Sequence, residues 1–511
     1  MLPKRVLDLG QSNDSIRLIE TEALSGPYIC LSYCWGRSLT ILCTRGNYES
    51  YQGNIPWLSL PLLFQNAVEV CRMLDIQYLW IDKLCIIQHD KDDWETEGSK
   101  MSQIFEGSFL TIGAAIPKDD SESLFFQDKK HSPSFKRHDG QLEDGSLFTI
   151  YSRIPVNCHL AEIASSKHGC EEYPLMSRAW VYQERLLAPR VLYFGQELSW
   201  ECRETSTCEC LGANRGIKYD HSLSLVPGVS RKKLHMQWQK MVEEFTWLQL
   251  SHEEDRLPAF SGLAQQYKHR LKSSYLAGLW GENLLADLIW FAYPESGSQA
   301  ERYYTRRPRK WRAPSWSWAS IEGPILFSKP DFIANTETDV KSLTWWIDVL
   351  SAQCTPSSLD PMGTVAKGHL IIKGSGRPAY LKHREAHEGH VTRHFSVGHP
   401  NNDSVYIRSN FTVDGQEANV DYDLIERGLM NSNSEMSVYC LFLGGMSFTQ
   451  RVFVLGQENY TSYPVFRTWS LLLYCVDGEI FERVGMLVSD NFDKDEVRFR
   501  ESLDQRVVTI V

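Results

Sequence analysis

The sequence has no long apolar run, and its longest apolar segments, such as Leu471–Val476, are far too short to cross a bilayer. The first residues, MLPKRVLDLGQSND, do not contain the apolar stretch of a signal peptide. Basic residues are in the minority, with 53 Lys and Arg against 64 Asp and Glu, so the formal net charge is −11. A chain with this charge does not coat nucleic acid or an anionic membrane. We therefore expect a cytoplasmic protein without a membrane or nucleic-acid partner.

Disulfide, metal and phosphate-loop signatures are also missing. The 13 cysteines are odd in number and lie mostly in apolar segments, which favours reduced thiols. Cys202, Cys208 and Cys210 do not have the spacing of common zinc modules, so we expect no metal. The sequence contains no GxGxxG, GxxxxGK[ST] or GxSxG motif. It therefore offers no signature of a bound cofactor.

Although the chain is acidic overall, it contains one local cluster of basic residues. It comprises Arg306, Arg307, Arg309, Lys310 and Arg312. No aromatic stacking pattern of an RNA-binding module accompanies it. We therefore expect this cluster to form a solvated turn.

The N-terminal part alternates between strand and helix patterns. Strands are predicted at 27–33, 78–82 and 108–115, and helices at 61–75 and 94–105. This β-α-β-α-β order is typical of a parallel sheet covered by helices. Further along, the sequence predicts a helix at 177–187 and strands at 191–194 and 198–202.

With 511 residues, the chain is long enough for about three domains. We predict an α/β domain at 25–205, interrupted by a polar, irregular insertion at about 117–170. A mostly helical region is expected at 206–335 and a β-rich region at 336–511, where short apolar runs alternate with turns.

Two candidate ligand-binding segments follow predicted strands. The first strand leads into Tyr33, Trp35, Gly36 and Arg37, where the glycine permits a tight turn and the arginine suits a phosphate. Asp82 ends the second strand, and ligands bind at the carboxyl ends of parallel strands. We expect the ends at Tyr33 and Asp82 to lie on one edge of the sheet. A structural alternative is that Asp82 caps the segment that follows it.

Several of these segments resemble the fungal heterokaryon-incompatibility (HET) family. The matching segments are YICLSYCWG at 28–36, YLWIDKLCIIQHDKDDW at 78–94, MSQIFEGSFLTIGAA at 101–115, PLMSRAWVYQERLLAPRVLYF at 174–194 and LSWEC at 198–202. Weaker matches follow at 255–264, 275–280 and 313–320. The resemblance implies non-self recognition and programmed cell death after fungal cell fusion, together with an incompatibility partner protein.

The HET domain is in turn similar to the TIR domain, and some TIR domains cleave NAD with a Ser-x-Trp-x-x-x-Glu motif. Ser177, Trp180 and Glu184 resemble this motif, although the serine stands three residues before the tryptophan instead of two. The resemblance implies that Glu184 is catalytic, that Trp180 binds substrate, and that NAD is a substrate and no cofactor is held. The alternative is that Glu184 pairs with a nearby arginine, of which Arg178, Arg185 and Arg190 are candidates.

Three other interpretations stay open. In the first, the chain is a non-enzymatic module that signals by homo-oligomeric assembly. In the second, it is an enzyme of fungal secondary metabolism that uses the same aromatic site. A thiol hydrolase is the third, because Cys85 and His89 would share a face if that stretch were helical. The apolar run around Cys85 favours an inert buried thiol instead.

Overall fold

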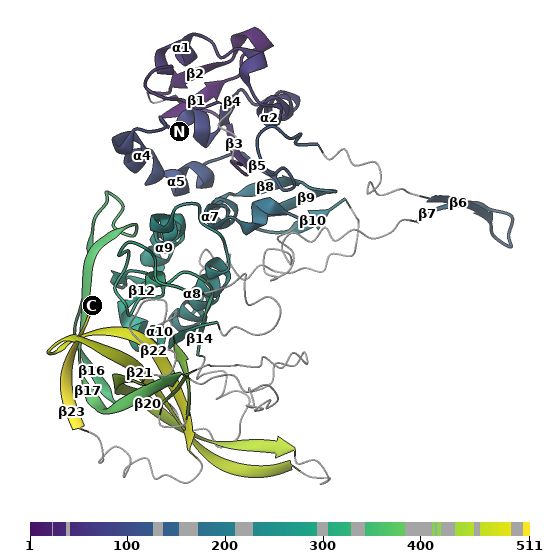
Figure 1. Cartoon of the computed structure of the whole chain (residues 1–511). Coiled ribbons are helices and arrows are strands. Elements are labelled where there is room, and N and C mark those ends of the chain that lie inside the picture. The colour runs from purple at the N-terminus through teal and green to yellow at the C-terminus, as the bar shows by residue number, and fades with distance from the viewer. Residues whose placement is uncertain are drawn as a thin grey trace. The chain divides into compact units, whose positions relative to one another are not determined.

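The structure is a computed structural model of the chain (Figure 1). It describes residues 1–22, 24–36, 41–125, 136–152, 172–209, 228–293, 305–328, 343–383, 411–413, 416–420, 435–453, 460–491 and 504–511. The chain divides into two compact units, each with a large sheet of its own. The first unit comprises residues 1–229, 248–251 and 258–266, and the second comprises 230–247, 252–257 and 267–511.

The first unit contains an eight-stranded mixed sheet in the order β10-β9-β8-β5-β3-β4-β1-β2. Its strands are β1 (Arg5–Asp8), β2 (Arg17–Glu20), β3 (Tyr28–Ser32), β4 (Tyr78–Trp80), β5 (Leu110–Ala114), β8 (Arg190–Phe194), β9 (Leu198–Cys202) and β10 (Ser206–Cys208). The four central strands β4, β3, β5 and β8 run parallel, and the pairs at both edges are antiparallel. The predicted α/β domain with a parallel sheet is confirmed, whereas β1, β2 and β10 were not predicted.

The order of the parallel strands determines where a ligand site is expected. The chain passes from β3 to β4 on one side of β3, and then crosses to β5 on the other side. The carboxyl end of β3 is therefore a point at which the direction of winding reverses, where open α/β sheets bind their ligands. Because β3 pairs in parallel with β4, Ser32 and Tyr33 meet the segment that begins at Asp82, and the predicted shared edge is confirmed.

The helices of this unit agree with the apolar pattern for the most part. They are α1 (Tyr48–Gly53), α2 (Leu62–Met73), α3 (Asp82–Cys85), α4 (Lys91–Gly98), α5 (Met101–Glu106) and α7 (Ala179–Leu187). Helix α2 buries Phe64, Ala67, Val68 and Cys71 completely, in agreement with their helical spacing, whereas Leu74, expected on the same face, follows the helix and is 44% exposed. The single helix predicted at 94–105 is wrong, because α4 ends at Gly98 and α5 begins at Met101, and glycine and serine propagate a helix poorly.

The prediction of an irregular insertion is wrong for its central part. Residues 136–152 form an antiparallel hairpin of β6 (Lys136–Gln141) and β7 (Leu147–Ser152). The turn contains Asp144-Gly145, and Gly145 has a φ of +82°, a backbone conformation that glycine adopts without strain. This Asp-Gly pair beside an apolar run is a hairpin signal that the polar composition of the insertion concealed.

The second unit combines helices with a large β region. Its helices include α8 (Arg231–Thr246) and α10 (Leu284–Asp287), and α9 (Pro258–Leu271) contributes its last five residues. Two small antiparallel pairs are β11 (Tyr275–Leu276) with β12 (Leu279–Trp280), and β13 (Trp290–Ala292) with β14 (Ile325–Phe327). The large sheet comprises β15 (Thr344–Trp345), β16 (Ile347–Pro356), β17 (Val365–His383), β18 (Phe411–Val413), β19 (Gln416–Val420), β20 (Glu435–Phe453), β21 (Tyr460–Asp477), β22 (Ile480–Asn491) and β23 (Asp504–Ile510). The predicted β-rich C-terminal region is confirmed.

The basic cluster at 306–312 is a solvated turn only at Arg309 and Lys310, which are exposed, and the expectation is wrong for the arginines on either side. Arg312 is buried and donates to the carbonyl groups of Ala319 and Ile321 at 2.8 and 2.9 Å. Arg306 pairs with both Glu253 and Glu322. These guanidinium groups therefore hold segments of the second unit together.

Two expectations about the whole chain can be compared with its described part. None of the cysteines that the structure describes forms a disulfide, in agreement with the predicted thiols. None of the described helices has both the length and the apolar content that a membrane crossing requires.

Candidate functional site

Glu184 is a buried carboxyl group on α7. The helix turns Val181, Tyr182 and Leu187 toward the core, and the Glu184 side chain is only 6% exposed. Ser32 at the end of β3 donates a hydrogen bond of 2.5 Å from its hydroxyl to Glu184 Oε2. Glu184 therefore lies at the carboxyl end of the strand where the winding of the sheet reverses.

Burial makes the charged form of Glu184 energetically unfavourable. Removal from water raises its pKa to about 7, against an ordinary value of 4.5. The positive charge of Arg178 and the hydrogen bond from Ser32 oppose this rise, while the negative charge of Asp82 adds to it. A carboxyl group with such a pKa changes its charge near neutral pH, as acid–base residues of enzymes do.

Asp82 is the second buried carboxyl group of the site. It accepts hydrogen bonds from the hydroxyl of Tyr33 at 2.9 Å, the indole of Trp35 at 2.6 Å and the backbone N–H of Lys83 at 2.7 Å. Burial raises its pKa, and these three donors and Arg178 act in the opposite direction. The bond to Lys83 matches the expected cap, and the other two bonds fix the loop that follows β3.

The loop after β3 contains the other predicted substrate-binding residues. Tyr33 is buried with its ring edge-on to Phe64, so it acts through Asp82 and presents no open face. Trp35 is half-buried and Gly36 is exposed. Gly36 has a φ of +67°, and a Cβ there would meet Asp119 at 2.1 Å. Arg37 lies outside the described residues.

The charge of Arg178, which immediately precedes α7, acts on both carboxyl groups. Its guanidinium donates to the carbonyl of Tyr33, and its charge lowers the pKa of both Glu184 and Asp82. No ion pair to Glu184 occurs among the described residues. Arg185 instead pairs with Glu201 at 2.8 Å, and Arg190 donates to the carbonyl of Phe109. The alternative of a salt-bridged Glu184 is therefore wrong.

Lys83 and Asp120 form a buried ion pair beside this loop. The ammonium and carboxylate are 2.6 Å apart, and both side chains are completely buried. Lys83 also donates to the carbonyl of Trp35 at 3.1 Å, and its charge lies 5.3 Å from the Trp35 ring. Trp35 is therefore held by Lys83 as well as by the hydrogen bond that its indole donates to Asp82.

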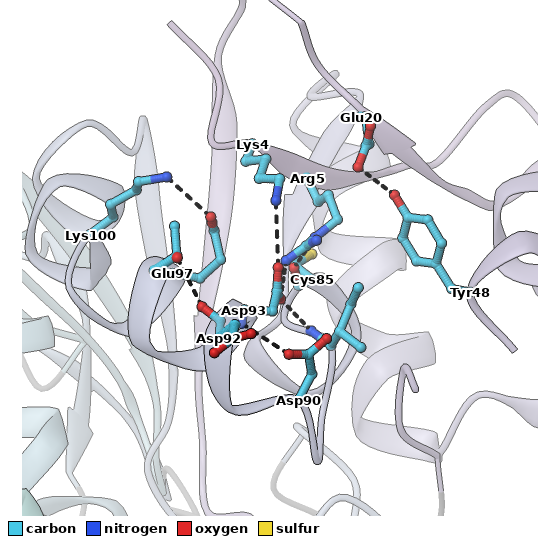
Figure 2. A network of polar contacts seen from close by, with 12 residues as sticks. Lys4, Arg5, Glu20, Tyr48, Cys85, Asp90, Asp92, Asp93, Glu97 and Lys100 are labelled. Carbon is cyan, nitrogen blue, oxygen red and sulfur yellow. Dashed lines mark hydrogen bonds and ion pairs between the residues drawn. The ribbon is translucent and has the colours of Figure 1, made fainter. Parts of the chain in front are cut away.

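A second polar network supports the segment that carries Asp82 (Figure 2). Arg5 on β1 is buried, donates to the carbonyl of Cys85 at 2.8 Å and pairs with Asp93 on α4. Asp93 also accepts from the backbone N–H of Ile87 at 2.9 Å. These bonds fix the chain directly after α3, whose first residue is Asp82.

Trp180 and Ser177 differ in how they relate to Glu184. Trp180 lies one turn before Glu184 on α7 and is half-buried against the same core as Trp35. Ser177 donates to the carbonyl of Pro174 at 2.7 Å, so its hydroxyl serves the turn before α7. The serine that contacts Glu184 is Ser32, which lies in the segment YICLSYCWG at 28–36 and was not selected from the sequence.

The thiol interpretation is not supported. Helix α3 ends at Cys85, Ile86 is extended, and His89 has a φ of +64°, so Cys85 and His89 do not share a helical face. Burial raises the pKa of the Cys85 thiol to about 12. Within the described part of the chain, no His, Cys, Asp or Glu cluster suits a metal ion, and Cys210 lies outside it.

Comparison with known proteins gives one result. The family model described as Heterokaryon incompatibility protein (HET) matches residues 28–184. This range contains Ser32, Asp82, Arg178 and Glu184 and ends at the last of them. No match was found among curated proteins or among solved structures.

Proposed function

We propose, from the premise that residues 28–184 are a HET domain, that the chain acts in fungal heterokaryon incompatibility and the cell death that follows it. The family match supports this assignment. We propose further that the domain produces its effect by chemistry at Glu184. The observation that carries this second step is a buried carboxyl group, bonded to Ser32, at the reversal point of the parallel sheet.

The proposed reaction is hydrolysis of the bond between nicotinamide and ribose in NAD⁺. The bond from the ribose C1′ to the pyridinium nitrogen breaks, and its electron pair leaves with neutral nicotinamide. Water adds to C1′ and loses one proton, which gives ADP-ribose. Nicotinamide needs no general acid, so one carboxylate that stabilises the positive charge on the ribose is sufficient. A likeness to TIR domains is part of this proposal.

Each residue of the site has a proposed role. The Glu184 carboxylate stabilises the charge on the ribose and accepts the proton from water. Trp180 and Trp35, both half-buried, provide ring faces for the nicotinamide or adenine. Arg178 has guanidinium N–H groups beyond the one bonded to Tyr33, and they suit the diphosphate. Asp82 acts as a positioning residue through Tyr33 and Trp35.

The test is release of nicotinamide by the purified full chain, followed by chromatography. The wild-type chain is expected to consume NAD⁺, and Glu184→Gln to be slower by about 10²–10³-fold, as for other preorganised electrostatic contacts. Glu106→Gln serves as the matched control, because Glu106 is an exposed carboxylate of the same unit. No release by the wild-type chain, or full activity in Glu184→Gln, would contradict the proposed chemistry and leave the family assignment untouched.

A second candidate is signalling through assembly of copies of the chain, without chemistry. The exposed β6–β7 hairpin favours it, because two of its apolar side chains, Leu147 and Tyr151, are 84% and 61% exposed. Cell death that persists on expression of Glu184→Gln would support this candidate over the enzyme.

A further inference from the structure

The β6–β7 hairpin has no partner strand within the described part of the chain. All residues of β7 are exposed except Phe148, which is half-buried over Gly140. Leu147, Ile150 and Tyr151 are 84%, 55% and 61% exposed. A two-stranded hairpin is only marginally stable alone in water and is stabilised by further strands or by packing. We therefore expect another strand or surface to cover the exposed apolar side chains of the hairpin.

The two edges of the hairpin differ in charge. Strand β6 carries Lys136, Arg137 and Asp139, and charged edge strands resist pairing with other strands. Strand β7 reads LFTIYS and carries no charge, glycine or proline. An uncharged edge of β-branched and aromatic residues is the type that pairs with another strand. The outer edge of β7 is therefore the one expected to accept a partner.

The register of the hairpin shows which backbone groups lie on that outer edge. Across the turn, the N–H of Leu142 donates to the carbonyl of Ser146 at 2.8 Å. Along two antiparallel strands, opposed residues that exchange backbone hydrogen bonds alternate with opposed residues that do not. From Leu142 and Ser146, the opposed residues of the hairpin continue away from the turn to Lys136 and Ser152. The backbone groups of Leu147, Thr149 and Tyr151 therefore point away from β6.

The sequence of this edge is chemically symmetric about Thr149. Residues 146–152 read SLFTIYS. When two such strands run antiparallel about a two-fold axis at Thr149, the threonines oppose each other. Phe148 then opposes Ile150, Leu147 opposes Tyr151, and Ser146 opposes Ser152. Apolar side chains meet apolar ones and hydroxyls meet hydroxyls, which are favourable cross-strand pairs.

We propose that β7 pairs with β7 of a second copy of this chain, which joins two hairpins into a four-stranded antiparallel sheet. The symmetry of the edge selects a second copy over an unrelated strand, because a two-fold interface requires a surface that is complementary to itself. This inference does not depend on the chemistry proposed for Glu184, and its test measures no enzymatic activity.

The test is the concentration dependence of the mass of the full chain, measured by sedimentation. Wild type is expected to form a dimer that dissociates on dilution. Thr149→Lys places two positive charges opposite each other at the axis, so the dissociation constant is expected to rise at least about tenfold. Leu142→Lys is the matched control, because it adds the same charge to an exposed residue directly after β6 in the same hairpin and should leave the dimer unchanged.

A charge exchange distinguishes lost pairing from a misfolded hairpin. Thr149→Glu alone should also be monomeric, whereas an equimolar mixture of Thr149→Lys and Thr149→Glu should form a mixed dimer. In addition, Thr149→Cys should form a disulfide across the axis under mild oxidation, since Cα atoms of a bonded pair are about 5.5 Å apart. A monomeric wild type, a dimer that Thr149→Lys leaves intact, or a mixture that stays monomeric would each overturn the proposal.

Discussion

Ser32 Oγ donates to Glu184 Oε2 at 2.5 Å across 152 residues of sequence. This bond joins the end of β3 to the middle of α7, and it favours the charged form of a carboxyl group whose burial favours the neutral form. Because no described residue forms an ion pair with Glu184, its charge is compensated only by this hydroxyl and by the more distant Arg178. When such a group is ionised, it lowers the free energy of unfolding. The first predictions follow from this loss of stability.

Glu184→Gln should stabilise the fold at alkaline pH. The pKa of Glu184 is about 7 in the folded chain against an ordinary 4.5, so between these values the folded state binds more protons than the unfolded one. Stability contributed by the neutral form is therefore fully present below about pH 4.5 and is lost as the pH rises through 7. The loss amounts to about 3 kcal/mol. Glutamine retains a neutral group of the same size and should not show this loss.

Denaturant unfolding of both proteins at pH 4.5 and pH 8.5 checks this expectation. The two should have nearly the same stability at the lower pH, and the variant should be the more stable at the higher pH. If Glu184→Gln were instead less stable at pH 8.5, the folded chain would favour the ionised form of Glu184, and burial would not dominate its pKa.

The rate of NAD⁺ hydrolysis should rise with pH through about 7. The proposed chemistry requires the carboxylate of Glu184, and kcat/KM reports the ionisation of the free enzyme. A profile that increases tenfold per pH unit below 7 and becomes flat above it is expected. A rate that falls as the pH rises through 7 would mean that the neutral carboxyl group is the active form, and would contradict the proposed role.

The sequence predicted the segments of this site better than the contacts within it. The patterns around Tyr33 and Asp82 indicated two strands, and the parallel arrangement was enough to place their ends together. A helix was predicted at 177–187, and Glu184 was selected within it because Trp180 and Glu184 resemble the motif of NAD-cleaving TIR domains. The contact with Ser32 was not found, because it depends on how α7 packs on the sheet, and no local pattern encodes that packing.

Other errors have similar physical causes. Asp82 bonds to the backbone of Lys83 as the capping alternative expected, but its further bonds to Tyr33 and Trp35 on another segment were not predicted. Arg5 lies in a short strand near the start of the chain that the sequence did not reveal, because four residues carry little periodicity. Its partner Asp93 stands in the run DKDD, whose composition does not distinguish a buried acid from an exposed one.

Ser32→Ala should raise the pKa of Glu184 further. The hydroxyl favours the charged carboxylate, and hydrogen bonds to charged groups contribute about 1.5–3 kcal/mol, which corresponds to about one pH unit or more. The midpoint of the pH–rate profile, or of the carboxyl signal in NMR titration, should move upward by that amount. Ser177→Ala is the control, because Ser177 bonds to Pro174 and should leave the midpoint in place. An equal shift in both variants would mean that Ser32 does not act on Glu184 directly.

Arg5→Met should destabilise the first unit far more than Arg17→Met. Each arginine pairs with an aspartate, but Arg5 and Asp93 are 1% and 8% exposed, whereas Arg17 is 53% exposed beside Asp8. Loss of Arg5 leaves the buried carboxylate of Asp93 without its guanidinium and the carbonyl of Cys85 without its donor, at a cost of about 3–5 kcal/mol. An exposed pair contributes about 1 kcal/mol or less. Urea unfolding of the two variants measures the difference. Similar losses in both would mean that water reaches Asp93, and the network in Figure 2 would then not be what fixes the chain behind Asp82.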